Sequence, residues 1–189
     1  DSLEVQRKVV CEEFKEHYIN KPYGDVWQHL RKLIYTKHPY QWQTIGKELK
    51  HVEDATLEDV KAFFNKHYTP SNAIMVIAGP VTTEQVKPLV EQWFGNIPSG
   101  NKYQRQLPVE PAQQEARMLK IEAKVPATAF YKVWHTGGRL DANYHATDLI
   151  TEILGGGASS RLYQRLVKEQ RLFSGISCYH FGSIDPGVL

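Results

Sequence analysis

A cluster of acidic side chains near the start of the sequence is the first place where chemistry could occur. Glu12, Glu13 and Glu16 put three carboxylates within five residues, and His17 follows directly. A surface helix usually mixes charges of both signs, so this cluster is unusually negative. It is either a solvated surface or part of a site that binds a cation, and the residue types leave both readings open.

Glu13 and His17 form a pair whose spacing is typical of a metal site, because residues four apart lie on the same side of a helix. The stretch from Glu13 to His17 differs by one residue from the inverted zinc motif HxxEH, in which two histidines bind zinc and a glutamate acts as the base. Here Glu13 takes the place of the first histidine. Glu, Lys and His also crowd many exposed helices, so a solvated face is the simpler explanation of the spacing alone.

The other candidate residues give weaker signals. No catalytic or metal motif includes the histidines His38, His51, His135 and His180. The first two are typical of surface or capping residues, and the last two fall on expected strands, where a buried and hydrogen-bonded role is more usual. Cys11 and Cys178 lie far apart, which argues against a disulfide framework or a thiolate zinc site. No nucleophile motif and no GxGxxG sequence is present.

The composition is that of an ordinary globular protein. Of 189 residues, 41% are hydrophobic and 23% are charged, which is enough apolar material for a core. The net charge is only +2 and the charges are interspersed, so nothing indicates nucleic acid or a membrane surface as a partner. No apolar run approaches the roughly 18 residues of a membrane-spanning helix.

The first half of the chain has mostly helical periodicity. We expect helices from Leu3 to about Tyr18, from Asp25 to before Lys37, from Thr56 to before Thr69, and from Thr82 to Phe94. Thr56 and Thr82 are each followed three residues later by a polar partner, which is typical of a capping box. The apolar run 73–78 predicts a strand that is buried on both faces.

The second half predicts strands together with helices. A proline- and glycine-rich stretch, residues 99–116, is expected to be an extended linker between two domains. After it, the patterns predict strands at 118–125, 130–135 and 174–181, with two helices between the second and the third. The chain stops within an expected strand, so we interpret it as an excerpt of a longer protein. The predicted fold class is α+β, with sheets flanked by helices.

The order of several motifs resembles the peptidase M16 family, which includes pitrilysin, insulin-degrading enzyme and the mitochondrial processing peptidases. The resemblance covers nearly the whole chain. It rests on six stretches: Arg7-x-Val9-Val10-x-Glu12-Glu13, His38-Pro39-Tyr40, Phe63-Phe64-x3-Tyr68-Thr69-Pro70-x-Asn72, Ala78-Gly79-Pro80-Val81, Phe94-Gly95-x-Ile97-Pro98 and Leu154-Gly155-Gly156-Gly157-x2-Ser160-Arg161-Leu162. Each stretch is modest alone, and their order and spacing carry the resemblance.

The resemblance implies a role for Glu13. In that family one helix carries HxxEH, and a later helix supplies the third zinc ligand as the last residue of a Glu-x6-Glu pattern. The matching pattern here is Gln6-x6-Glu13, which implies Glu13 as a zinc ligand and Gln6 as an outer-shell residue that has lost the usual charge. Glu16 and His17 are then surface residues. The HxxEH helix is expected before Asp1, so this fragment contains no catalytic residue and is expected to bind no zinc and to cleave nothing by itself.

The family order also implies a domain division and a function. Residues 1–98 correspond to the C-terminal part of a zinc-bearing domain, and 117–189 to the N-terminal part of a second domain of the same type. The Arg and Tyr that bind substrate in the non-catalytic half are replaced here by Val167 and Ser174, which favours the zinc-bearing half.

The full-length protein is then expected to be a zinc-dependent endopeptidase. It would hydrolyse peptides in a chamber formed with a second half. The alternative is a non-catalytic, structural M16-like subunit. The compartment is open, with bacterial cytoplasm and periplasm both compatible.

Overall fold

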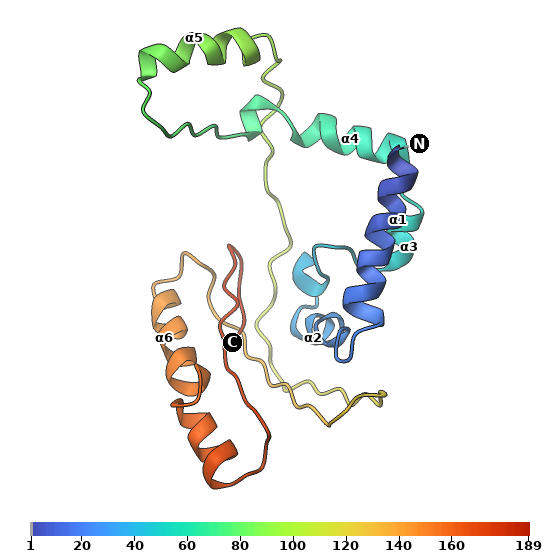
Figure 1. Cartoon of the computed structure of the whole chain (residues 1–189), viewed down its shortest axis with the longest axis vertical. Helices are drawn as coiled ribbons and strands as arrows, with labels where there is room; N and C mark the ends of the chain where they lie inside the picture. The colour runs from blue at the N-terminus through green and yellow to red at the C-terminus, as the bar shows by residue number, and fades with distance from the viewer. Residues whose placement is uncertain (1) are drawn as a thin grey trace. The chain divides into compact units, whose positions relative to one another are not determined.

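The computed structural model describes residues 2–189, and its regular structure is helical (Figure 1). The α-helices are α1 (Ser2–Phe14), α2 (Val26–Ile34), α3 (Leu49–Glu53), α4 (Leu57–His67), α5 (Thr83–Phe94) and α6 (Tyr144–Gly155). Two π-helical segments, η1 (Lys15–Ile19) and η4 (Tyr163–Glu169), and two short 3-10 turns, η2 (Pro39–Gln41) and η3 (Pro70–Asn72), complete the set. None of these helices has the length and apolar content needed to cross a membrane.

The chain forms two compact units, and neither is continuous in sequence. The first consists of Asp1–Lys21 and Gln43–Leu107, and the second of Pro22–Trp42 and Pro108–Leu189. Residues 22–42 therefore leave the first unit, join the second, and return. The domain division drawn from the sequence, 1–98 and 117–189 with a linker at 99–116, concerns the longer protein and stays a prediction.

In the first unit, α1 packs beside α3 through one face, on which Cys11 and Phe14 are buried. The predicted capping boxes at the starts of α4 and α5 are confirmed. The Thr56 hydroxyl accepts from the Asp59 N–H at 3.1 Å, and the Asp59 carboxylate accepts from the Thr56 N–H at 2.9 Å. Such reciprocal bonds satisfy N–H groups that the first helical turn leaves free, which is why the helix begins there.

The second unit has its core where α2 ends. Ile34, Tyr35 and Val188 are buried together, and four partly buried side chains pack around them: Trp27, Leu30, Tyr40 and Val133. The Tyr35 hydroxyl donates to the Pro186 carbonyl at 2.9 Å, so its polar end is satisfied inside this core. Burial raises the pKa of Tyr35 to about 12, which keeps the hydroxyl a donor at every physiological pH.

A single carboxylate organises the backbone immediately after α2. Glu110 accepts hydrogen bonds from three successive N–H groups, those of Thr36, Lys37 and His38, at 2.7, 2.8 and 2.8 Å. It also accepts from the Thr36 hydroxyl at 2.8 Å. Burial alone would raise the pKa of Glu110, but these bonds favour its charged form more strongly and hold the pKa at about 2.

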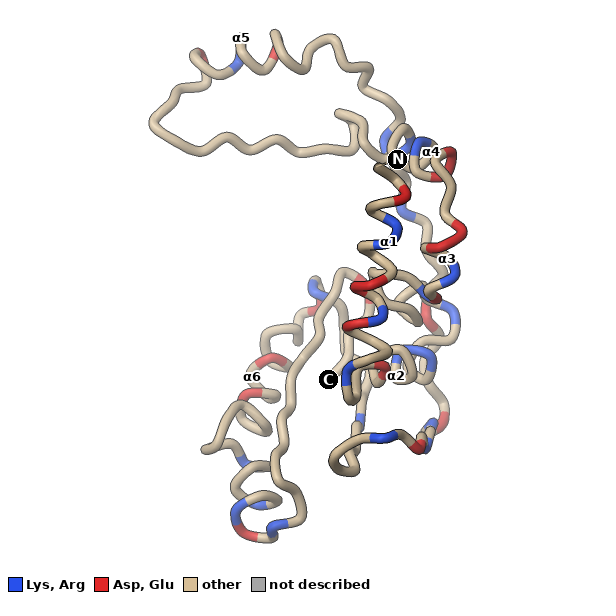
Figure 2. Tube along the Cα trace, turned by 45° about the vertical axis from the view of Figure 1, so that its right-hand side comes forward, with Lys and Arg blue, Asp and Glu red and all other residues tan. Residues whose placement is uncertain are grey.

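The predicted α+β class is wrong for this structure. Residues 2–189 contain no strand, only isolated bridges that pair Gln43 with Gly46, and His135 and Phe181 with Val188. The segments predicted as strands, 73–78, 118–125, 130–135 and 174–181, join no sheet. The run 73–78 lies in a stretch without any charge (Figure 2), yet Ile74 is 93% exposed and Val76 is 82% exposed.

The reason for this error is physical. An apolar or alternating pattern reports which side chains avoid water, whereas a sheet also needs a neighbouring segment whose N–H and C=O groups complete the ladder. The segments 73–78 and 118–125 have no such neighbour among the residues that the structure describes. The segments 130–135 and 174–181 bond only to residues 187–189, through isolated bridges at Val188, and this contact is too short to form a ladder.

The Glu110 interactions predict a specific pH dependence of stability. Because the folded state lowers the pKa from 4.5 to about 2, the contribution of Glu110 is complete above about pH 4.5 and disappears as pH falls toward 2. We expect Glu110→Gln to lower the free energy of unfolding at pH 7 by about 1–2 kcal/mol, the lower range for charged hydrogen bonds at a half-exposed site. Urea unfolding followed by the intrinsic tryptophan fluorescence measures it. A wild-type-to-variant difference that stays constant from neutral to strongly acid pH would contradict this explanation.

Candidate functional site

Helix α1 has two faces with different roles. At 3.6 residues per turn, Glu13 lies about 200° around the axis from Cys11, and so points away from the side that packs on α3. Gln6 lies seven residues before Glu13, which is about two turns and roughly 10.5 Å along the same face. Both side chains are exposed. The predicted metal ligand and its predicted outer-shell neighbour therefore share one solvent-facing surface.

The Glu13 carboxylate has no bonding partner among the residues that the structure describes. Among residues 2–189 it makes no hydrogen bond and no ion pair, whereas the neighbouring Glu12 is held by Lys15 at 2.8 Å. That hydrogen bond raises the pKa of Lys15 and stabilises the ion pair. Glu13 is thus the carboxylate of this pair that is available to a cation.

The Glu13–His17 pair suggested by spacing lies across a change in helix type. Glu13 belongs to α1, and His17 belongs to the π-helical η1, where i to i+5 bonds replace the α-helical pattern. Glu16 and His17 are both exposed. No group of three or more metal-ligating side chains gathers anywhere in residues 2–189. The donors described here therefore offer single ligands and no complete metal site.

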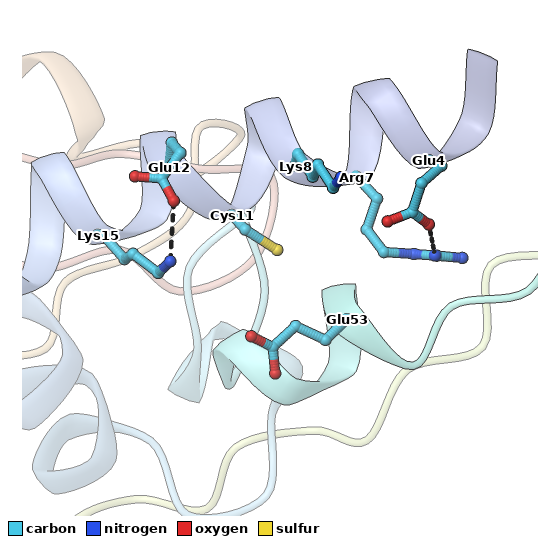
Figure 3. Close-up of a pocket in the computed structure, with 7 residues that line it drawn as sticks. All are labelled: Glu4, Arg7, Lys8, Cys11, Glu12, Lys15 and Glu53. Atoms are coloured by element: carbon cyan, nitrogen blue, oxygen red, sulfur yellow. Dashed lines mark hydrogen bonds and ion pairs between the residues drawn. The ribbon is translucent and has the colours of Figure 1, made fainter. Parts of the chain in front are cut away.

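The opposite face of α1 forms a charged pocket with α3 (Figure 3). Seven residues line it: Glu4, Arg7, Lys8, Cys11, Glu12, Lys15 and Glu53. Three cations and three carboxylates cancel there, and Arg7 bonds to Glu4 and, at 2.5 Å, to the Ala55 carbonyl just beyond α3. The Arg7–Glu4 pair lies within α1, and the Arg7–Ala55 bond joins α1 to the chain just after α3, on the side of α1 that packs against α3. Glu13 lies on the other side of the helix.

The isolated histidines have structural partners. His38 is 2% exposed, its Nδ1 accepts from the Tyr40 N–H at 3.1 Å, and its Nε2 lies 3.1 Å from Asp185. It therefore caps the η2 turn, and it is buried rather than on the surface. His135 bonds the Ile34 carbonyl at 2.9 Å.

His180 is bonded in a similar way. Its Nε2 lies 3.1 Å from the Thr136 hydroxyl, and its side chain is fully buried. The predicted hydrogen bonds of His135 and His180 are confirmed, and the predicted burial is confirmed for the His180 side chain, whereas His135 is only partly buried.

Sequence reasoning missed the network around the end of α2. Glu110 and His38 are 72 residues apart, and each looks like an ordinary polar residue in its own local context. No periodicity links them. The one available signal was His38-Pro39, because a side-chain acceptor before a proline is typical of a capped turn.

The match to known proteins extends over the whole chain. The model of the family described as "Peptidase M16 inactive domain" matches residues 54–189, so the chain belongs to this family, and the resemblance read from the motifs is confirmed. A protein named "Zinc protease PqqE" from Helicobacter pylori is 31% identical over the full chain, which covers 43% of that protein. "Uncharacterized zinc protease YmxG" from Bacillus subtilis is 25% identical over the full chain and is covered to 45%.

Solved structures agree with this assignment. A crystal structure of a protease from Helicobacter pylori matches 98% of the chain with a TM-score of 0.76 and 26% identity, and 46% of that protein is covered. A peptidase M16 inactive domain from Pseudomonas fluorescens matches with a TM-score of 0.70 at 23% identity, with all of this chain and 45% of that chain covered, and so shows the fold alone. The chain thus spans less than half the length of these relatives.

The donor count predicts the behaviour of residues 1–189 toward zinc. A catalytic zinc site needs about three protein ligands, and Glu13 offers one. We expect calorimetric titration of this 189-residue chain with zinc to show no saturable, stoichiometric binding at neutral pH. Tight binding of one zinc per chain that is lost in the Glu13→Gln variant would show instead that the chain assembles a site of its own.

Proposed function

We propose that these 189 residues are part of a zinc-dependent endopeptidase, to which they contribute the third zinc ligand. The observation that carries the proposal is the setting of the Glu13 carboxylate. It is exposed and makes no ion pair or hydrogen bond among residues 2–189, and its helix packs against α3 through the opposite face. The membership of the M16 family and the relatives named as zinc proteases support the same reading.

Each residue of the α1 face would have a defined task. Glu13 would bind zinc through a carboxylate oxygen, and Gln6, two turns earlier, would bond to an outer-shell group through its amide. Zinc, when bound, lowers the pKa of its water and polarises the scissile carbonyl. Glu13 sets the charge and geometry of the site and takes no part in proton transfer. The remaining two ligands and the base would come from an HxxEH helix upstream of Asp1.

The substrate and partner follow from the same assignment. The substrate would be a peptide, and a second M16 half, in the same chain or in a partner subunit, would complete a chamber around it. Since a catalytic zinc site needs about three protein ligands and Glu13 is one, the proposal takes the other ligands from outside residues 2–189.

A non-catalytic subunit is the second candidate. Two observations favour it: the matching family model describes an inactive domain, and Gln6 stands where the family pattern has a glutamate. The discriminating feature is the roughly 60–90 residues upstream, a spacing taken from the family resemblance. An intact HxxEH there supports the peptidase, and a degraded one supports the structural role.

Replacement of Glu13 in the full-length protein tests the proposal. We expect Glu13→Gln to weaken zinc binding by at least about a hundredfold, since losing even an outer-shell partner typically costs 10- to 100-fold. Peptidase activity on an unstructured peptide should fall with zinc content, measured by competition with a chelator and by elemental analysis.

Glu16→Gln is the matched control, because it removes an equally exposed carboxylate from the adjoining helical segment. The control should retain both zinc and activity. Full zinc content and unchanged activity in Glu13→Gln would remove Glu13 from the site.

A further inference from the structure

The first unit leaves most of its apolar side chains in contact with solvent. Cys11 and Phe14 are its only buried residues among those that the structure describes, and no residue from 43 to 107 is buried. That range contains α4, α5 and the segment between them. Folded domains bury most of their large hydrophobic side chains, and a large exposed apolar surface marks an interaction site. The contacts within this unit therefore leave an apolar surface for a partner.

The exposed side chains come from α4, from the segment 73–78 and from α5 (Figure 1). Residues 67–83 contain no Asp, Glu, Lys or Arg, so the middle segment has no charged group that favours exposure to water (Figure 2). Six large apolar side chains, two from each of these segments, are at least 55% exposed and form what we call the α4–α5 apolar set: Phe63, Phe64, Ile74, Val76, Leu89 and Trp93.

This exposure does not come from a lack of local structure. The capping boxes at Thr56 and Thr82 fix where α4 and α5 begin. The Ser71 N–H donates to the Ser99 carbonyl at 2.9 Å, which closes residues 72–98 into a loop. These bonds are local and remove no apolar surface from water, and the helix packing of this unit joins α1 to α3. The α4–α5 apolar set is thus presented on ordered elements.

The part of the protein that precedes residue 1 is joined directly to this unit. Ser2 belongs to the first unit and Leu189 to the second, so chain upstream of residue 1 leads straight into α1. The 189 residues cover only 43% to 46% of the relatives named above, so a protein of their length has room for such a segment. The proposed function also draws two zinc ligands from it, which brings it to the Glu13 side of α1.

That side of α1 carries exposed apolar residues too. Val9 and Val5 lie four and eight residues before Glu13, which places them about 40° and 80° around the helix axis from it. They are 50% and 57% exposed. Glu13 therefore stands beside an apolar strip, which is the surface that a second helix needs in order to pack against α1.

We propose that the α4–α5 apolar set, together with Val5 and Val9, is the docking surface for the segment of the same protein that precedes residue 1. Docking of this segment completes the apolar core of the first unit. That the segment also carries the HxxEH helix rests on the proposed function, whereas the docking itself does not. With both, folding of the first unit and assembly of the zinc site are one event, because one segment supplies the missing core and the missing ligands.

Photo-crosslinking in the full-length protein tests the docking. The photoreactive aromatic residue p-benzoylphenylalanine is placed at Phe63 or at Trp93, where it replaces another aromatic side chain. Lys87 on α5 is the control position, because its side chain is 70% exposed and lies 3.9 Å from Glu91 on the charged side of the helix. We expect crosslinks within one molecule from Phe63 and Trp93 to peptides upstream of residue 1, and few from Lys87.

Three results would overturn the proposal. Crosslinked dimers would assign the surface to a second copy of the chain. Crosslinks to residues 108–189 would assign it to the second unit. Yields from Phe63 and Trp93 no higher than from Lys87 would show a surface that stays in solvent.

Val76→Lys in the full-length protein gives an independent measurement. Val76 is 82% exposed among residues 2–189, so a lysine is tolerated there unless another segment covers it. Because a buried unpaired charge is destabilising, we expect the folded-to-unfolded ratio in urea unfolding to fall at least about tenfold. Gln104→Lys adds the same charge at an exposed position of the same unit and should leave the ratio unchanged. Equal stability of the two variants would contradict the docking.

The outcomes separate this proposal from the role of Glu13. Upstream crosslinks and a destabilising Val76→Lys, together with zinc binding that is indifferent to Glu13→Gln, would support the docking surface and reject Glu13 as a ligand. Loss of zinc in Glu13→Gln without upstream crosslinks would keep Glu13 as a ligand and overturn the docking surface.

Discussion

The hydrogen bonds between one carboxylate and three consecutive backbone N–H groups hold the second unit together. A helix that ends inside a structure leaves carbonyls free, and the extended chain after it leaves N–H groups free; burying either without a partner is costly. Glu110 accepts from the free N–H groups and Arg117 donates to a free carbonyl, and both belong to one stretch eight residues long. With those groups satisfied, Ile34 and Tyr35 can be buried against Val188 and the core can form. The apolar core therefore depends on a polar interaction.

In the first unit, the two faces of α1 have different roles. One side of α1 packs against α3 and carries the Arg7–Ala55 bond to the chain just after α3, and the other side carries Gln6 and Glu13 in solvent. Because α1 is held by the face that packs against α3, a side chain on its solvent-exposed face can keep its position without making contacts of its own. The pocket between α1 and α3 is lined by three cations and three carboxylates, so its formal charges balance.

Local features of this protein were readable from sequence, and long-range ones were not. The helix starts at Thr56 and Thr82 follow from hydroxyl and carboxyl or amide groups three residues apart, which is chemistry confined to one turn. The run 73–78 was apolar enough to predict a strand, but pairing depends on a partner that a local pattern does not contain. Glu110 escaped notice for the same reason, since its partners lie 72 to 74 residues away. The candidate ligand Glu13 came from motif order, and its exposure and freedom came from the structure.

The placement of acidic residues on α1–η1 bears on why Glu13 is there at all. Like charges three or four residues apart on a helix repel each other, and Glu16 stands in that relation to both Glu12 and Glu13. Lys15 offsets the repulsion for Glu12, but no side chain of residues 2–189 does so for Glu13. A bound cation would relieve this repulsion, which is the electrostatic argument for the proposal that Glu13 is a ligand.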